Sequence, residues 1–353
     1  MRAPERKVEV GVLGATGMVG QQFARLLAGH PWFKLTWVAA SDRSAGKPYA
    51  EATSWRLDGE MPQEFRALPV QECAPTQAVP RLVFSSMEAG VATDIEQAFA
   101  AAGHVVISNS RNHRMEPDVP LLVPEINAEH LQMIPHQQRR RGWSGQIVTN
   151  PNCSTVVLSM SLAPLRKFGI RRVLATTMQA ISGAGYPGVA AMDINANVIP
   201  FIGGEEEKMQ QETPKILGDF AAGSIRPLAM HVSASCHRVP VVDGHTLAVS
   251  VGLEAKPAAE EIVSAIRNFR GVPQQRKLPS APSEPLIYLE QADRPQPRRD
   301  ANRENGMVVF VGRLRPCPVL DWKFLALGHN TIRGAAGAAI LNAELMVSEG
   351  LLD

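Results

Sequence analysis

A short strand that runs directly into a glycine-rich loop constrains the fold of this chain more than any other feature. Residues 8–13 form a short apolar run, and glycine follows at every third position, at Gly14, Gly17 and Gly20. A helical apolar spacing and a second strand at residues 35–40 come next. This order is typical of the βαβ unit that binds dinucleotides. Its glycines allow a tight turn, let the pyrophosphate approach the backbone and let the helix pack on the sheet. A plain tight turn is the alternative, because GxxGxxG is not the commoner spacing.

The loop after the second strand indicates which dinucleotide binds. Asp42 could accept a hydrogen bond from a ribose 2′-hydroxyl, which would favour NAD. Ser41, Arg43, Ser44 and Lys47 offer donors that suit a 2′-phosphate. We therefore predict NADP, with a solvated polar turn as the alternative for this loop.

Two further strands indicate a parallel sheet. They lie at residues 82–85 and 104–108, and a helix is expected between them at residues 91–102. Alternating strands and helices predict an α/β fold with a parallel sheet. Arg111 and Arg114 follow the second of these strands. Because open α/β sheets bind ligands at the carboxyl ends of their strands, these arginines are either anion-site candidates or ordinary surface residues.

Cys153 stands where a nucleophile could be built. An apolar strand at residues 147–149 precedes it, and residues 156–163 are typical of a buried helix. Pro151 cannot pair inside a strand, so the strand ends and Cys153 falls at the mouth of the helix. Free N–H groups and the helix dipole there favour a thiolate, which suits covalent catalysis. A lone cysteine is more often a small buried core residue, so this motif alone leaves both possibilities open.

The second half of the chain predicts a mixed sheet. A long strand is expected at residues 172–181, and further strands at 307–314 and 322–327. A flexible, glycine-rich turn at residues 182–188 would let a ligand approach the backbone. A helix is expected to open near Glu205, whose carboxylate could simply complement the helix dipole.

An Asp-Gly pair at residues 243–244 predicts a β-hairpin between two alternating strands. His245 follows this turn directly. A lone histidine at a hairpin is usually a surface residue, but beside a cysteine nucleophile it could serve as the acid/base.

Composition excludes several classes of protein. The 353 residues are 45% hydrophobic and 20% charged with a net charge of +2, which is typical of a globular protein without a nucleic-acid surface. The chain contains no run of about 18 apolar residues, so no membrane span is predicted. The N-terminal residues lack the apolar stretch of a signal peptide. Four cysteines without a CxxC pair argue against a disulfide framework or a zinc ribbon. We therefore expect a cytoplasmic protein without a metal site, and a mobile or partner-contacting loop at residues 293–305.

Taken together, the motifs resemble the aspartate-semialdehyde dehydrogenase family over nearly the whole chain, and its archaeal and fungal branch most closely. They are GATGMVG at 14–20, SDRSAGK at 41–47, SNSRNHRM at 108–115, NPNCST at 150–155, QAISGAG at 179–185, GGEEEK at 203–208 and RVPVVDGH at 238–245. Their order and spacing are far more specific than any single motif. One departure is Glu207, which stands where many bacterial members carry tryptophan.

The resemblance implies a reaction and an architecture. The reaction is the NADPH-dependent reductive dephosphorylation of L-4-aspartyl phosphate to L-aspartate 4-semialdehyde and phosphate, in biosynthesis of lysine, threonine, methionine and isoleucine. The implied fold has a Rossmann-type NADP-binding domain at residues 1–150 and an α+β catalytic and dimerisation domain with a mixed sheet at 151–330. The C-terminal helix at residues 331–353 is expected to pack back on the first domain. A homodimer or homotetramer is implied as well.

The resemblance also assigns roles to residues. Cys153 would form a thioester, His245 would act as the acid/base, and Gln179 would orient the acyl group. Substrate-binding groups would be Arg238 and Glu205 for the carboxylate and amine, and Arg114 and Lys208 for the phosphate, with Asn109 and Ser110 nearby. The implied cofactor-binding residues are Gly14, Thr16, Gly17, Met18, Val19, Ser41, Arg43, Ser44, Ser85, Ser182, Gly183 and Asn330.

Other activities use a similar chain. An acyl-CoA reductase of the malonyl-CoA type, or an N-acetyl-glutamyl-phosphate reductase, would share the acyl-enzyme chemistry. An acid at position 205 for an amine, together with Arg238, favours an amino-acid substrate. A non-catalytic NADP-binding paralogue would be expected to have lost Cys153 or His245, and this chain has both. Cys73, Cys236 and Cys317 are expected to be free thiols that the chemistry does not need.

Overall fold

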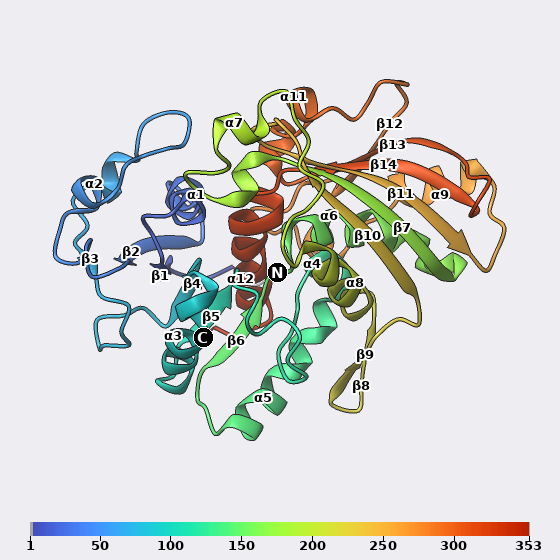
Figure 1. Ribbon diagram of the computed structural model, residues 1–353. Coiled ribbons are helices and arrows are strands. Elements are labelled where there is room, and N and C mark those ends of the chain that lie inside the picture. Colours follow the sequence, from blue (N-terminus) through green and yellow to red (C-terminus); the bar gives the residue numbers. More distant parts are fainter. Residues whose placement is uncertain (1–2, 353) are drawn as a thin grey trace.

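A computed structural model describes residues 3–352 of the chain. Met1, Arg2 and Asp353, at the outer ends of the predicted first domain and C-terminal helix, lie outside the described residues. The molecule is built on two six-stranded sheets, with helices α6 (Cys153–Leu162) and α12 (Gly337–Ser348) in the region between them (Figure 1).

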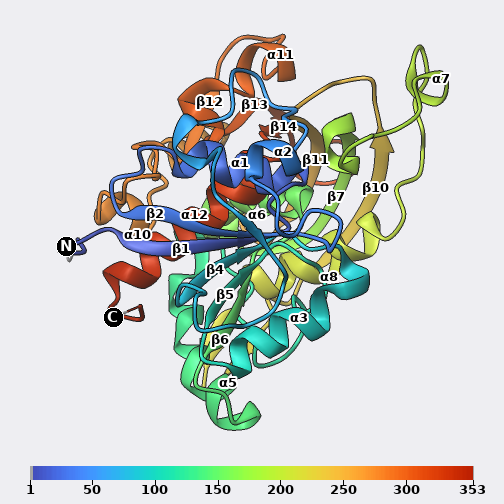
Figure 2. The same ribbon diagram turned by 90° about the vertical axis from the view of Figure 1, so that its left-hand side faces the viewer.

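The first sheet is parallel throughout, in the order β3-β2-β1-β4-β5-β6 (Figure 2). Its strands are β1 (Val8–Leu13), β2 (Phe33–Ala39), β3 (Val70–Gln71), β4 (Leu82–Ser85), β5 (Val105–Ser108) and β6 (Gln146–Thr149). Helix α1 (Met18–Leu27) joins β1 to β2, and α3 (Ala89–Ala101) joins β4 to β5. The prediction of a parallel α/β sheet is confirmed. The strand order reverses between β1 and β4, which is the place where such sheets bind ligands.

The C-terminal helix belongs to the core of the first sheet. Ile340 and Leu345 of α12 lie in one apolar cluster with Val10, Phe23 and Phe84. A wide π-helical turn, Ile332–Ala336, leads into α12 from the second sheet. After the last strand of the second sheet, the chain therefore returns to pack on the first sheet.

The second sheet is mixed, in the order β10-β7-β11-β14-β13-β12. Its strands are β7 (Ile170–Gln179), β10 (His231–Arg238), β11 (His245–Leu253), β12 (Leu286–Leu289), β13 (Val309–Pro316) and β14 (Trp322–Gly328). Helices α6, α8 (Glu205–Ile216) and α9 (Ala259–Arg267) contribute to the core on one face of this sheet. Leu174, Thr176, Ser233 and Ser235 point to the opposite face and are exposed, so that face is uncovered at β7 and β10.

The predicted hairpin at residues 243–244 is wrong. Strands β10 and β11 do not pair with each other, because β7 lies between them, parallel to β10 and antiparallel to β11. The Asp-Gly pair does reverse the chain, but turn chemistry fixes only the local reversal and not which strands become neighbours. Residues 239–244 cross over the end of β7, so Arg238 pairs across from Gln179 and His245 begins the strand on its other side.

The predicted mobile loop at residues 293–305 is an ordered segment built on one buried carboxylate. Asp300, at the end of α11 (Pro297–Asp300), pairs with Arg294 and Arg303 and accepts the backbone N–H of Gln296 at 2.8 Å. Charge in this segment thus serves an internal network.

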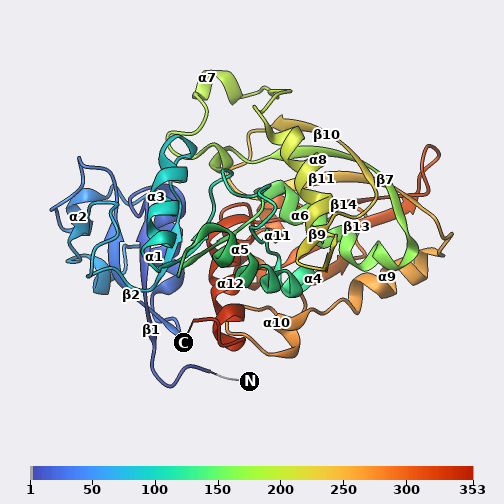
Figure 3. The same cartoon turned by 90° about the horizontal axis from the view of Figure 1, so that it is seen from below.

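Short elements complete the chain: α2 (Tyr49–Ala52), α4 (Pro124–Asn127), α5 (Ile134–Arg141), α7 (Ala191–Ile194), β8 (Asp219–Ala221), β9 (Ser224–Arg226) and α10 (Val272–Gln275). Helix α7 lies on a segment that projects from the rest of the molecule (Figure 3). In the part of the chain that the structure describes, no helix is long and apolar enough to cross a membrane.

We predict that the π-helical turn depends on one buried ion pair. Arg333 donates to both carboxylate oxygens of Glu125 at 2.7 Å, and both side chains are fully buried. Arg333→Met should lower the free energy of unfolding by about 3–5 kcal/mol, because it leaves a buried carboxylate without a partner. Urea denaturation would measure this free energy. The control is Arg66→Met, which disrupts the exposed pair with Glu60 and should change the free energy of unfolding by less than about 1 kcal/mol. Equal effects of the two substitutions would contradict the prediction.

Candidate active site

A cavity of about 320 Å³ lies where the carboxyl ends of the first sheet face the second domain. Most residues predicted to act on the substrate or nicotinamide line it together. The predicted residues in its wall are Met18, Val19, Asn109, Ser110, Arg114, Cys153, Ser182, Gly183, Glu205, Lys208 and Asn330. They come from the glycine loop, the ends of β5, β6 and β7, the start of α8 and the π-helical turn.

Cys153 is the first residue of α6, as the sequence predicts. The side-chain oxygen of Asn152 caps this helix by accepting the N–H groups of Ser154 and Thr155 at 3.0 and 3.2 Å. On the other side, a Cβ at Gly334 would lie only 2.6 Å from Cβ of Cys153. The nucleophile is therefore held between the mouth of α6 and the π-helical turn, and only glycine fits at position 334.

His245 is fully buried, and its Nε2 atom lies 3.2 Å from Sγ of Cys153. Its other ring nitrogen, Nδ1, accepts the backbone N–H of Ala180 at 3.1 Å. A backbone N–H can only donate, so Nδ1 carries no proton. A neutral imidazole then carries its proton on Nε2, directed at the sulfur. The pairing of β11 with β7 fixes this tautomer.

Burial sets the charge state of this pair. Burial, reinforced by Glu205, raises the pKa of the Cys153 thiol to about 12. Burial, reinforced by Arg238, lowers the pKa of His245 to about 3. Desolvation thus opposes the thiolate that the helix mouth is expected to favour. The resting pair is a neutral thiol beside a neutral imidazole.

Glu205 forms hydrogen bonds with three other side chains on the side of the cavity where the substrate is expected. Its carboxylate accepts Nδ2 of Asn152 at 2.8 Å, Nε2 of Gln179 at 3.3 Å and Nζ of Lys208 at 2.6 Å. Burial acts to raise the pKa of Glu205, but Lys208 and the amide hydrogen bonds outweigh burial and keep that pKa below its usual value. Glu205 is therefore an ionised, prealigned acceptor for a cation.

Arg238 offers a guanidinium that no carboxylate of the described residues satisfies. Its NH1 group donates to the carbonyl of Ala180 at 2.7 Å, and the side chain is almost fully buried. A Cβ at Gly183 would lie 2.9 Å from NH1 of Arg238 and 3.0 Å from Cε1 of His245. Glycine at position 183 thus lets the backbone pass directly over the Arg238 and His245 side chains.

Arg114 is positioned by helix α8. It donates to Oε1 of Glu212 at 3.0 Å and to the carbonyl of Asn109 at 2.8 Å. Glu212 also accepts the N–H of Asn152 at 2.7 Å, which joins the anion side of the cavity to the nucleophile's helix. Sequence reasoning missed Glu212, although it follows Lys208 by one helical turn and so shares a face of α8 with it. Arg111, one of the two arginines considered from the sequence, lines the same cavity.

The glycine loop fits a dinucleotide. Helix α1 has no side-chain cap and no acidic residue in its first turn, so its N–H groups are free for a diphosphate. Gly14 has φ of 73°, and a Cβ at Gly20 would lie 2.3 Å from the Gly14 carbonyl. Gly17 has no such neighbour, which leaves room for a ligand against the backbone. These are the three roles that the sequence predicts for the glycines.

Several predicted cofactor residues lie outside the cavity wall. Ser41, Arg43 and Ser44 are on the loop that follows β2, next to the glycine loop. The Ser85 side chain is not in position, because it is fully buried and its hydroxyl donates to Glu96 at 2.6 Å. Asn330 does face the cavity, where it donates to the Ser182 hydroxyl at 2.8 Å and accepts the N–H of Gly244 at 2.9 Å.

Comparison with known proteins gives a consistent result. Residues 9–134 match the family model described as semialdehyde dehydrogenase, NAD binding domain, and residues 162–333 match semialdehyde dehydrogenase, dimerisation domain. Aspartate-semialdehyde dehydrogenase of Methanothermobacter thermautotrophicus is 52% identical over 343 residues, covering 96% of this chain and 99% of the relative. The Saccharomyces cerevisiae protein of that name is 43% identical, covering 97% and 98%.

A solved structure extends the comparison to three dimensions. Aspartate-semialdehyde dehydrogenase with NADP from Candida albicans is 43% identical, covers 98% of this chain and 100% of its own, and has a TM-score of 0.91. These relatives come from an archaeon and from fungi, the branch that the motifs resemble most closely.

We predict that Cys153 in the free protein reacts as a thiol of raised pKa. Because burial raises its pKa to about 12, the thiolate fraction should still be rising at alkaline pH. Alkylation by iodoacetamide, followed by peptide mass spectrometry, should accelerate about tenfold per pH unit from roughly pH 7 to 9. Cys317 is the internal control, because backbone hydrogen bonds lower its pKa and its rate should level off earlier. A plateau for Cys153 near neutral pH would indicate a thiolate–imidazolium pair and contradict the prediction.

Proposed function

The chain belongs to the aspartate-semialdehyde dehydrogenase family, and we propose that the cavity around Cys153 is the site of its reaction. That reaction is the NADPH-dependent conversion of L-4-aspartyl phosphate to L-aspartate 4-semialdehyde and phosphate, in amino-acid biosynthesis. The observation that carries the proposal is the contact of 3.2 Å between Sγ of Cys153 and Nε2 of His245. The carboxylate of Glu205 and the cationic side chains of Arg114 and Lys208 line the cavity beside this contact.

The charges of the cavity suit the three charged groups of the substrate. Glu205 would accept the ammonium group, and Arg238 the α-carboxylate in a bidentate contact. Arg114 and Lys208 would hold the phosphate. Lys208 pairs with Glu205 at 2.6 Å when no substrate is present, so the incoming ammonium would replace it and free it for the phosphate. One substrate would then pair with each of these four charged side chains.

Acyl transfer can proceed without a protein base. The tautomer of His245 places a proton on Nε2, so this nitrogen donates to sulfur and to the substrate oxygen and does not accept the thiol proton. The Sγ–carbon bond forms while the carbon–oxygen bond to phosphate breaks. The thiol proton leaves with the phosphate as hydrogen phosphate, which balances the step.

Reduction then uses the same donor. Bound NADPH supplies the hydride that the acyl group receives. His245 Nε2–H would donate to the oxygen that gains negative charge, with Gln179 holding the acyl group in place. When the aldehyde carbonyl forms again, the sulfur leaves as a thiolate and takes a proton from solvent. His245 thus stabilises charge throughout and need not change its own.

We also propose the division of the chain and its assembly. Residues 1–150 with the helix at 331–353 would form the NADP-binding domain, and 151–330 the catalytic and dimerisation domain; α12 in the first core supports this. The uncovered face of the second sheet, which exposes Leu174 and Thr176, would form the contact of a homodimer or homotetramer. We place the enzyme in the cytoplasm, where its four free cysteines would stay reduced.

The proposed function is tested by phosphate-dependent oxidation of aspartate semialdehyde. The purified protein should reduce NADP faster than NAD when semialdehyde and phosphate are both present. Cys153→Ala should abolish this activity, because no thioester can form, while Cys236→Ala serves as the matched control and should remain active. Substantial turnover by the Cys153 variant would refute the covalent mechanism, and acyl-CoA substrates run in parallel would reveal a different specificity.

A further prediction separates a donor from an acid/base at position 245. His245→Ala should lower kcat about 10²–10³-fold, as the loss of one donor to a developing oxyanion does. His245→Gln retains an N–H donor near the Nε2 position. Its kcat should be at least about tenfold higher than that of His245→Ala, because it keeps roughly one charge-assisted hydrogen bond. The kcat of the His245→Gln variant should not change with pH between roughly pH 6 and 8. Equal losses for alanine and glutamine would show that proton transfer by the imidazole is required.

A further inference from the structure

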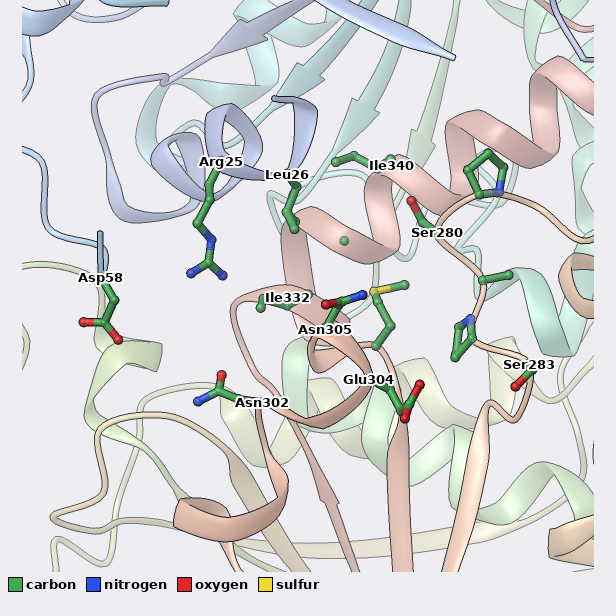
Figure 4. Close-up of a pocket in the computed structure, with 15 residues that line it drawn as sticks. Arg25, Leu26, Asp58, Ser280, Ser283, Asn302, Glu304, Asn305, Ile332 and Ile340 are labelled. Atoms are coloured by element: carbon green, nitrogen blue, oxygen red, sulfur yellow. The ribbon is translucent and has the colours of Figure 1, made fainter. Parts of the chain in front are cut away.

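A second cavity lies away from Cys153 and shares no wall residue with the catalytic cavity. Its volume is about 730 Å³, within the range of about 300–1,000 Å³ typical of small-molecule sites (Figure 4). The end of α1, residues 279–283, residues 302–307 and the junction of the π-helical turn with α12 form its walls. Asp58 adds a fifth wall segment, so five segments distant in sequence line this cavity.

The walls of this cavity are fixed in place. Glu344 of α12 is fully buried and accepts the backbone N–H of Ser280 at 3.0 Å and its hydroxyl at 2.6 Å, which anchors one wall. The opposite wall contains three successive left-handed residues, Glu304, Asn305 and Gly306, with φ of 49°, 54° and 73°. Two such residues other than glycine in a row are costly, at about 1–3 kcal/mol each, and such strain concentrates at ligand sites.

Six polar side chains in this cavity form no side-chain hydrogen bond or ion pair within the described residues, namely Arg25, Asp58, Ser283, Asn302, Glu304 and Asn305. Arg25 is half-buried and the other five are exposed, so all six are accessible to a ligand. Their charges are one guanidinium and two carboxylates. Leu26, Met307, Ile332 and Ile340 add an apolar surface. In Figure 4, Arg25, Asp58 and Asn302 lie on one side and Glu304 and Ser283 on the other, with Ile332 between them.

We propose that this cavity binds an α-amino acid that carries a second ammonium group at the end of an aliphatic chain. Arg25 would hold the carboxylate, and Asp58 the α-ammonium beside it. The aliphatic chain would lie along Ile332, and Glu304 would hold the distal ammonium. One negative and two positive groups on the ligand match the one positive and two negative groups of the wall.

Other ligand classes match less well. A phosphate or nucleotide would meet two carboxylates and one guanidinium, which disfavours an anion. A neutral apolar ligand would desolvate Arg25, Asp58 and Glu304 without pairing them. A simple zwitterion would leave Glu304 unpaired. The charge count therefore selects a diamino monocarboxylic acid.

The position of the cavity gives the site a route to the catalytic centre. Ile332 and Gly337 face this cavity, whereas Thr331, Gly334 and Ala335 of the same turn face the catalytic one. A Cβ at Gly306 would lie 2.9 Å from Cδ1 of Ile332, so the left-handed wall also rests on this turn. A bound ligand would contact the back of the turn that holds Cys153.

Isothermal titration calorimetry on the full-length protein tests the proposal. L-lysine is the probe, L-norleucine lacks the distal ammonium, and 1,5-diaminopentane lacks the carboxylate. L-lysine should bind with Kd below about 1 mM, and each of the other two at least tenfold more weakly, since each loses one charged contact. Absence of L-lysine binding, or equal affinity for L-norleucine, would overturn the proposal.

Variants locate the site. Arg25→Gln and Glu304→Gln should each weaken L-lysine binding at least about tenfold, and Glu260→Gln, an exposed carboxylate on α9, should leave it unchanged. All three should keep wild-type turnover of aspartate semialdehyde, which shows that they are folded and keeps this test independent of the catalytic proposal. L-lysine binding that is unchanged in both cavity variants would place the ligand elsewhere and refute the assignment.

Discussion

The pairing of β7 between β10 and β11 is the constraint on which the catalytic site depends. It brings the end of β10, the end of β7 and the start of β11 together, so that Arg238, Gln179 and His245 meet although the chain separates them by up to 66 positions. The same pairing directs the Ala180 N–H at Nδ1 of His245. Backbone geometry thus decides which ring nitrogen carries the proton, and that decision determines what the imidazole can do to the sulfur 3.2 Å away.

Burial and charge act together on the two reacting groups. Both are neutral at rest, because neither a thiolate nor an imidazolium is solvated in this cavity. In the proposed reaction the substrate would supply what the protein lacks. Its leaving phosphate would take the thiol proton, and its ammonium group would replace Lys208 at Glu205. Helix α8 organises the rest, since Glu205, Lys208 and Glu212 lie on one face of it, beside the proposed ammonium and phosphate positions and the nucleophile's helix. Reactivity would therefore develop only in the complex, which protects the thiol in the free enzyme.

Local patterns in the sequence predict local structure well. The glycine loop, strands β1 and β4 and the start of the Cys153 helix follow from turn residues and apolar spacing within a few positions. The hairpin at residues 243–244 fails because strand pairing depends on β7, some 60 residues earlier. The raised pKa of the Cys153 thiol could not be predicted, because burial there depends on the π-helical turn around Gly334, which no local pattern indicates. The cavity at Arg25 and Glu304 could not be predicted from the sequence either, since its walls come from five distant segments.

Direct detection of the acyl-enzyme tests the central claim, that Cys153 carries the aspartyl group. The enzyme would be mixed with aspartate semialdehyde and NADP in the absence of phosphate, quenched in acid and mapped by peptide mass spectrometry. The account predicts an aspartyl adduct on the peptide that contains Cys153, labile to hydroxylamine and discharged when phosphate is added before the quench. An unmodified Cys153 under conditions in which NADP is stoichiometrically reduced, or an adduct on Cys73, Cys236 or Cys317, would contradict it.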